Sequence, residues 1–259
     1  MRLVRFSYAG KKNYGVLTGD TVRGLQGSPF TRFNPNSPQV FDGTAYILSQ
    51  VQLLSPCLPS KIVCLGLNYR SHIEEMKLPM PSVPLIFLKP STSVTGPEDK
   101  IILPPDWNRI DFEGELGVVI GKKAKDVPEK NAWEYVLGYT CFNDVSDRIA
   151  QAADGQWTRA KGYDTFAPMG PCIETEIKPD NLKIETYLNG EVRQSASTGD
   201  LLFGVSRLIN FISGVMTLMP GDVIATGTPS GVGPMKPGDV VEVKIENIGT
   251  LKNFVTGLD

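Results

Sequence analysis

Two carboxylates stand two residues apart, Glu113 and Glu115, where the apolar segment Gly114 to Ile120 begins. In an extended chain such residues point to the same face, about 7 Å apart, and two anions that close repel each other near a core. A third carboxylate, Asp144, ends another apolar segment and could reach the same point from a neighbouring strand. Three oxygen ligands predict a site for Mg²⁺, Mn²⁺ or Ca²⁺ rather than zinc, with positions left for water and substrate. The alternative is a solvated strand end.

His72 is the only histidine of the chain, so imidazole chemistry near neutral pH must use it. Glu75 lies three residues later and would share its face of a short helix. A carboxylate so placed can orient the ring, which predicts a pair that takes a proton from water. The proline-rich segment 77–84 that follows is suited to a lid. The alternative is a surface histidine without a catalytic role.

Three further basic residues could contact a substrate. Lys161 is a candidate electrophile that stabilises developing enolate charge, and the alternative is a surface salt bridge to Asp164. Lys89, next to Pro90, and Arg148, next to Asp147, are weaker candidates for substrate binding, with ordinary surface charges as the alternative.

The loop 225–233, Ala-Thr-Gly-Thr-Pro-Ser-Gly-Val-Gly, follows a predicted strand. It offers the backbone N–H of Gly227 and the hydroxyl of Thr228 to a substrate carboxylate. No Lys-Ser/Thr pair follows its glycines, so it is not a phosphate-binding loop of the Walker type. A plain β-turn is the alternative.

The composition excludes several classes of protein. The chain has 259 residues, 41% of them hydrophobic, which is enough for a sizeable core. With 26 basic and 28 acidic residues and no basic run, we expect no nucleic-acid or membrane partner. We find no apolar segment long enough to span a bilayer and no signal-peptide pattern, so we expect a cytoplasmic protein. A reducing compartment also suits the unpaired spacing of the cysteines, which are Cys57, Cys64, Cys141 and Cys172.

The spacing of apolar residues predicts two units. Residues 1–55 indicate a small β-rich domain of short strands and tight turns, with a Pro/Ser-rich stretch at 32–38. A second proline cluster at 55–60 places the boundary near residue 56, and residues 56–259 form the larger unit.

Strands dominate the larger unit, so we predict a mainly β or α+β fold. Asn189-Gly190 predicts a tight hairpin, since both central residues of a type I′ turn need positive φ. The clearest helix is expected at 205–218, with shorter ones at 69–77, 128–135 and 145–152. The predicted strands are 62–67, 85–88, 114–120, 136–142, 182–188, 222–226 and 240–245.

Together these segments resemble the fumarylacetoacetate hydrolase family over roughly residues 60 to 255, and the first 55 residues look like the small N-terminal domain of many bacterial members. The resemblance implies a mixed β-sandwich roll and a homodimer. It also implies that Glu113, Glu115 and Asp144 bind the metal, that His72 and Glu75 activate water, and that Lys161 and Thr228 contact substrate. The motifs that carry the resemblance are Gly66-x-Asn68-Tyr69-x-x-His72-x-x-Glu75, Phe87-Leu88-Lys89-Pro90, Glu113-x-Glu115-Leu116-x-Val118-Val119-Ile120-Gly121, Asn143-Asp144-Val145-Ser146-x-Arg148, Lys161-Gly162-Tyr163-Asp164-Thr165-Phe166-x-Pro168 and Thr226-Gly227-Thr228-Pro229-x-Gly231-Val232-Gly233.

The resemblance implies Mg²⁺- or Mn²⁺-dependent cleavage of a carbon–carbon bond in a small 2-oxo or 2,4-dioxo acid. The leading hypothesis is an acylpyruvate hydrolase or oxaloacetate decarboxylase that works through a metal-stabilised enolate. The first alternative is an enzyme of aromatic catabolism, a 2-hydroxyhepta-2,4-diene-1,7-dioate isomerase or 5-oxopent-3-ene-1,2,5-tricarboxylate decarboxylase. The second is a non-catalytic protein that binds 2-oxo acids.

Overall fold

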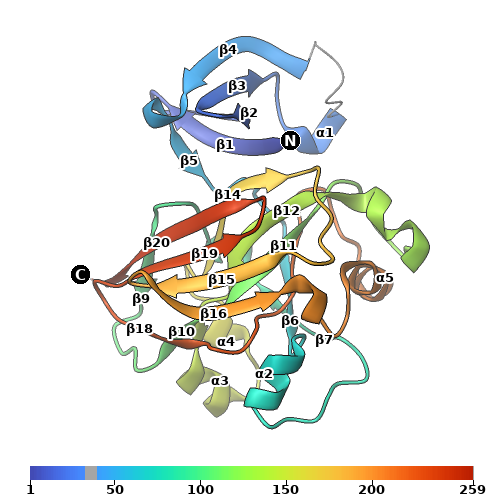
Figure 1. Ribbon diagram of the computed structural model, residues 1–259, viewed down its shortest axis with the longest axis vertical. Helices are drawn as coiled ribbons and strands as arrows, with labels where there is room; N and C mark the ends of the chain where they lie inside the picture. The colour runs from blue at the N-terminus through green and yellow to red at the C-terminus, as the bar shows by residue number, and fades with distance from the viewer. Residues whose placement is uncertain (33–39, 259) are drawn as a thin grey trace.

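The computed structural model describes residues 1–32 and 40–258, so the predicted Pro/Ser-rich stretch at 32–38 lies almost wholly outside the described residues. A twelve-stranded mixed sheet runs through the molecule (Figure 1). Its main path is β4 (Phe41–Ile47), β3 (Thr21–Leu25), β2 (Lys11–Thr18), β1 (Arg2–Tyr8), β14 (Ala167–Glu174), β12 (Val136–Asn143), β11 (Gly114–Ile120), β17 (Val223–Ala225), β6 (Ile62–Gly66) and β7 (Leu85–Lys89), with β5 (Gln52–Leu54) on β1 and β8 (Val94–Thr95) on β14.

Two smaller sheets complete the structure. The larger of them packs across β11 and β12, and apolar residues from both layers meet in one core, among them Leu116, Val118, Ile184 and Val243. This confirms the predicted mixed β-sandwich. The five-stranded sheet has the order β16 (Glu191–Ser197), β15 (Lys183–Leu188), β19 (Val240–Ile245), β20 (Gly249–Gly257) and β9 (Lys100–Leu103), and the three-stranded sheet has the order β13 (Ser146–Asp147), β10 (Ile110–Phe112) and β18 (Gly233–Met235).

The hairpin predicted at Asn189-Gly190 is confirmed. Both residues have positive φ, 54° and 82°, and β15 and β16 pair antiparallel on either side of them. The strands predicted at 114–120 and 240–245 also have the observed bounds of β11 and β19.

The helices differ more from expectation. The predicted helix at 205–218 ends at Val215, because Met216 already has extended backbone angles. The segment expected at 128–135 is a 3₁₀ helix, and the helix expected from 145 begins at Arg148, where the Asp147 carboxylate accepts the N–H groups of Ile149 and Ala150. The helices are α1 (Pro29–Arg32), α2 (Arg70–Glu75), α3 (Arg148–Asp154), α4 (Thr158–Lys161) and α5 (Val205–Val215), with 3₁₀ turns η2 (Leu48–Gln50), η3 (Ser91–Ser93), η4 (Glu129–Tyr135) and η5 (Thr198–Asp200).

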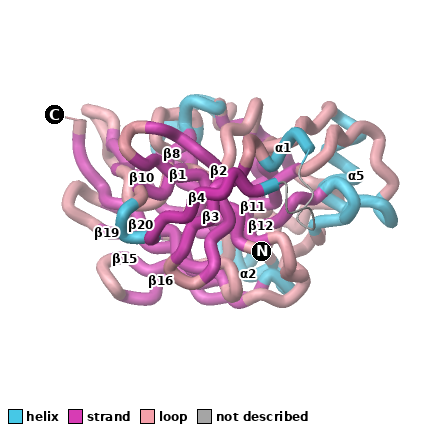
Figure 2. Tube along the Cα trace, turned by 90° about the horizontal axis from the view of Figure 1, so that it is seen from above, coloured by secondary structure: helices cyan, strands magenta, loops and turns pink. Residues whose placement is uncertain are grey.

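The N-terminal strands continue the main sheet. β1 pairs with β14 through Arg2 opposite Glu174 and Leu3 opposite Ile173, so the sheet crosses the boundary predicted near residue 56. Seen from above, these strands lie over the middle of the larger unit (Figure 2). No helix within the described ranges is long and apolar enough to cross a membrane.

Candidate metal centre and substrate pocket

The structure brings the three predicted carboxylates together. Glu113, Glu115 and Asp144 each offer one oxygen, all within 4.8 Å of one another, and all three side chains are buried. The pairing of β11 with β12 places them, because Gly114 lies opposite Asn143 and the N–H of Asp144 bonds to the carbonyl of Glu113 at 2.9 Å. We call these three residues the acidic cluster.

The residue between the two glutamates is a glycine that packs closely against the facing sheet. A Cβ on Gly114 would lie 2.0 Å from the hydroxyl of Thr186 on β15, so a larger residue there would force the Thr186 side chain to move. The N–H of Gly114 donates to Gln194 at 3.0 Å, and the N–H of Glu113 donates to the Asn143 side chain at 2.9 Å. The chain around the glutamates is therefore held by β12 of the same sheet and by β16 of the facing sheet.

Two buried lysines pair with the acidic cluster. Lys161 Nζ lies 2.9 Å from Glu113 Oε2 and 2.6 Å from Asp144 Oδ2, so it does not form the surface bridge to Asp164 that was its alternative. Lys89 Nζ lies 2.5 Å from Asp144 Oδ1 and 3.0 Å from the carbonyl of Val145. Lys89 is thus no surface charge, and its predicted contact with substrate stays a prediction.

Arg148 links the cluster to a fourth carboxylate. Its Nη2 lies 2.5 Å from Glu113 Oε1 and its Nε lies 2.8 Å from Asp111, while Nη1 donates to Gln151 at 2.9 Å. Asp111 is fully buried and also accepts two bonds from Arg109. Arg148 is therefore part of a buried network and not the surface charge considered as its alternative.

Sequence reasoning missed Asp111, Arg109 and Gln151. A signal for Asp111 was available, since it continues the same alternation as Glu113 and Glu115 and therefore points to the same face of an extended chain. Gln151 lies three residues after Arg148, one turn along α3.

The pKa values of the two glutamates in the acidic cluster are shifted in opposite directions. Burial acts to raise the pKa of Glu113, but the charges of Lys161 and Arg148 outweigh it and hold that pKa below its usual range. Burial raises the pKa of Glu115 well above its usual range, and the nearby Asp144 and Glu113 charges add to the effect. The N–H of Gly227, 2.8 Å from Oε2, and the charge of Lys161 act to lower this pKa but do not outweigh burial.

This charge pattern fits a hard divalent cation. Among the described residues, Glu115 has no basic partner within ion-pair distance, so the cluster carries one carboxylate that a metal would compensate. Three converging carboxylate oxygens are the donor set that such ions prefer.

His72 and Glu75 meet on the short helix α2. His72 Nδ1 lies 3.0 Å from Glu75 Oε2, and Glu75 Oε1 accepts the N–H of Gly231 at 3.2 Å. The chain just before the helix is held in place, because the side chain of Asn68 bonds to the backbone of Phe203 and Thr226. The imidazole therefore has a defined orientation.

The loop 225–233 bonds to the acidic cluster and to the backbone beside it. The hydroxyl of Thr228 donates to the carbonyl of Gly114 at 3.0 Å and accepts from Gln194 at 2.8 Å. The N–H of Gly227 is used by Glu115. The predicted contacts of these two residues with a substrate carboxylate stay predictions.

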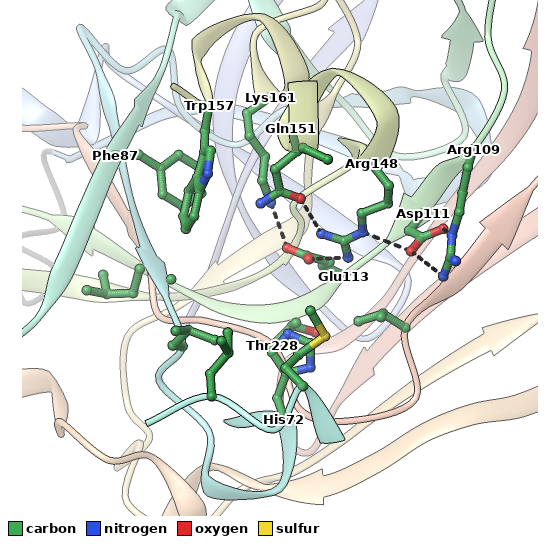
Figure 3. Close-up of a pocket in the computed structure, with 17 residues that line it drawn as sticks. His72, Phe87, Arg109, Asp111, Glu113, Arg148, Gln151, Trp157, Lys161 and Thr228 are labelled. Carbon is green, nitrogen blue, oxygen red and sulfur yellow. Dashed lines mark hydrogen bonds and ion pairs between the residues drawn. The ribbon is translucent and has the colours of Figure 1, made fainter. Parts of the chain in front are cut away.

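A cavity of about 500 Å³ lies beside these groups, and Glu113 is the member of the acidic cluster that lines it. Figure 3 shows Lys161, Glu113, Arg148, Asp111 and Arg109 in a row along one side, with His72 and Thr228 opposite. Aromatic and aliphatic side chains form the rest of the wall. They are Leu65, Leu67, Met76, Leu78, Phe87, Ala152, Trp157 and Val232.

Known proteins resemble this chain over most of its length. Residues 61–256 match the model described as fumarylacetoacetate (FAA) hydrolase C-terminal, and residues 1–56 match the one described as Rv2993c-like, N-terminal. A mitochondrial oxaloacetate tautomerase of Rattus norvegicus is 43% identical over 219 residues, 80% of this chain and 70% of that protein.

Two solved structures align over the full length of both chains. A 5-carboxymethyl-2-hydroxymuconate delta-isomerase from Mycobacterium smegmatis has a TM-score of 0.93 at 45% identity. A maleylpyruvate hydrolase from Sphingobium sp. SYK-6, in complex with manganese(II) and pyruvate, has a TM-score of 0.82 at 31% identity. These matches confirm the resemblance read from the motifs: the chain is an enzyme that belongs to the fumarylacetoacetate hydrolase family.

Proposed function

We propose that this enzyme uses Mg²⁺ or Mn²⁺ to hydrolyse a carbon–carbon bond in a small 2,4-dioxo acid of the acylpyruvate type. The observation that carries the proposal is that His72, which bonds to Glu75, lines the same cavity as Glu113 and Lys161. The likeness to a maleylpyruvate hydrolase crystallised with manganese and pyruvate supports it.

Glu113, Glu115 and Asp144 would hold the metal. A divalent ion supplies Lewis-acid polarisation of the oxygens of a 2-oxo acid. Lys161 keeps its charge at the cluster: burial acts to lower its pKa, but the charges of Asp144 and Glu113 raise that pKa above its usual value. Its ammonium can therefore stabilise negative charge that develops on substrate oxygen.

The chain's own residues can carry the proton transfers of hydrolysis. His72, oriented by Glu75, takes a proton from water, and the water oxygen adds to the distal carbonyl carbon. The bond between that carbon and the pyruvate carbon then breaks, and its electron pair passes to pyruvate as an enolate. A proton returned to the enolate carbon completes pyruvate, while the acyl group leaves as a carboxylic acid.

A second candidate needs no water addition. The same site could move a proton within an enolised substrate, as an isomerase or tautomerase, or release CO₂ from oxaloacetate or a ring-cleavage diacid. The relatives named as an isomerase at 45% identity and an oxaloacetate tautomerase at 43% identity favour this candidate.

Acetylpyruvate and oxaloacetate, assayed with Mg²⁺ and with chelator, test the proposal. We expect acetylpyruvate hydrolysis that chelator abolishes, and equal rates in both conditions would contradict it. His72→Ala separates the candidates, because it should abolish hydrolysis and spare a reaction that needs no activated water. Metal-dependent binding without any turnover would favour a non-catalytic role in binding 2-oxo acids.

A further inference from the structure

One cationic group of the pocket has no part in the mechanism above. Arg109 precedes β10, lines the cavity, and has a side chain that is 53% exposed. Its Nε and Nη2 bond to the two oxygens of Asp111 at 3.1 and 3.2 Å. Within the described part of the chain, its Nη1 has no acceptor, so one edge of the guanidinium is free to bind a ligand.

Arg109 is held in place by the chain around it. Asp111 is fully buried and is itself held by Arg148, whose Nε lies 2.8 Å away. The backbone carbonyl of Arg109 also accepts the N–H of Arg148 at 3.0 Å. A guanidinium that is fixed on one edge and open on the other is arranged for bidentate recognition of a carboxylate.

The place of Arg109 in the pocket suits the far end of a substrate. In Figure 3 the row of charged residues runs from Lys161 through Glu113 and Arg148 to Asp111 and then Arg109, so Arg109 is at the opposite end from Lys161. A 2-oxo acid whose carboxylate end lies at the acidic cluster would extend its tail along this row.

The charges of the pocket also favour a second anionic group. The side chains joined by ion pairs around the pocket, together with Glu115, comprise four acidic and four basic groups, whose charges cancel when all are ionised. A divalent cation would leave an excess of two positive charges, and a dicarboxylate would neutralise it where a monocarboxylate would not. The groups are Asp111, Glu113, Glu115, Asp144, Lys89, Arg109, Arg148 and Lys161.

We propose that Arg109 binds the distal carboxylate of the substrate and so makes the enzyme selective for dicarboxylic 2-oxo acids, a proposal that rests on the 2-oxo acid site proposed above. Arg109 is then a specificity-determining residue and takes no part in bond cleavage.

Binding of unreactive matched acids tests this selectivity. 2-Oxoadipate and 2-oxohexanoate have the same six carbons and differ in a terminal carboxylate against a methyl group; 2-oxoglutarate and 2-oxopentanoate form a pair one carbon shorter. None has the 4-oxo group that cleavage needs, so calorimetry with Mg²⁺ reports binding alone. We expect the dicarboxylate of at least one pair to bind about tenfold more tightly, as a charge-assisted hydrogen bond at a half-exposed site allows.

Three variants assign the effect to Arg109. Arg109→Gln should remove the preference and leave the affinity for the monocarboxylate within about twofold, while Arg109→Lys should keep part of it. Arg159→Gln is the matched control. The Arg159 side chain is 58% exposed and donates from two nitrogens to one aspartate, Asp154, but it does not line the cavity. This variant should leave both affinities unchanged.

The possible failures are distinguishable. Two results would show that Arg109 does not bind the distal carboxylate: equal affinity of wild-type protein for both members of each pair, or an equal loss of both affinities in Arg109→Gln. Either result would overturn only this inference. If wild-type protein with Mg²⁺ binds none of the four acids, the 2-oxo acid site itself is wrong and the proposed function falls with it.

Discussion

The acidic cluster and the helix α2 both face the pocket, yet they are built in opposite ways. The cluster is buried and receives bonds from β7, α3 and α4 as well as from its own strands. The helix α2 has six residues and no side-chain cap at its start. The segment after it exposes large apolar side chains, Met76, Leu78, Met80 and Val83.

This difference separates two tasks. A metal site needs ligand oxygens in fixed positions, which dense packing and multiple partners secure. A group that activates water must stand where water and substrate enter. Segments with few buried contacts open locally at a lower free energy than a core does, so we expect α2 and residues 76–83 to be the part that admits substrate. Each prediction below tests whether one region can be damaged without the other.

The largest effect is expected from Asp144→Asn. This change leaves the buried Lys89 and Lys161 without the anion that both contact. We expect the free energy of unfolding to fall by about 3–5 kcal/mol, and kcat/KM to fall by about 10³-fold or more. Urea unfolding and the acetylpyruvate assay measure the two losses. Unchanged stability would show that the cluster does not hold the fold as described.

Glu115→Gln should separate metal binding from folding. Glu115 has no basic partner among the described residues, and glutamine can still accept the N–H of Gly227. Without metal, we expect the free energy of unfolding to stay within about 1 kcal/mol of wild type. Affinity for Mn²⁺, measured by calorimetry, should fall at least about 100-fold, with a matching loss of activity. A variant as unstable as Asp144→Asn would contradict this reading.

His72→Ala should damage only α2 and the residues 76–83 after it, which together we call the lid. We expect hydrolysis to fall by about 10² to 10⁴-fold, the usual contribution of a general base. Unfolding should change by no more than about 1 kcal/mol, since the ring's one side-chain partner in the described structure is Glu75. Affinity for Mn²⁺ is the control and should not change. A large loss of that affinity would mean that lid and cluster are not independent.

The smallest effect is expected from Glu75→Gln. The amide can keep a hydrogen bond to His72 but loses the charge that stabilises a protonated ring, so we expect about a tenfold loss in kcat. Glu74→Gln is the matched control, because Glu74 is also exposed but is not the residue that bonds to His72. Equal effects of both changes would refute the orienting role of Glu75.

Local patterns predicted much of this molecule. The apolar segments at 114–120 and 240–245 became β11 and β19 with the expected bounds, and Asn189-Gly190 formed its hairpin. These features depend on neighbours in sequence, so composition and spacing are sufficient. The long strands β14 and β20 were not predicted. Each has a partner far away in the chain, since β14 pairs with β1 and β20 pairs with β9.

The sequence by itself determined which residues could bind a metal or move a proton, since three carboxylates at strand ends and a single histidine leave few choices. Only the tertiary structure decided how their charges are balanced. Lys89, Arg148 and Lys161 each had a surface alternative, and the fold placed all three against the same carboxylates. Ion pairs of this kind join residues 17 to 55 positions apart, and such distances close through strand pairing and packing that no local pattern encodes.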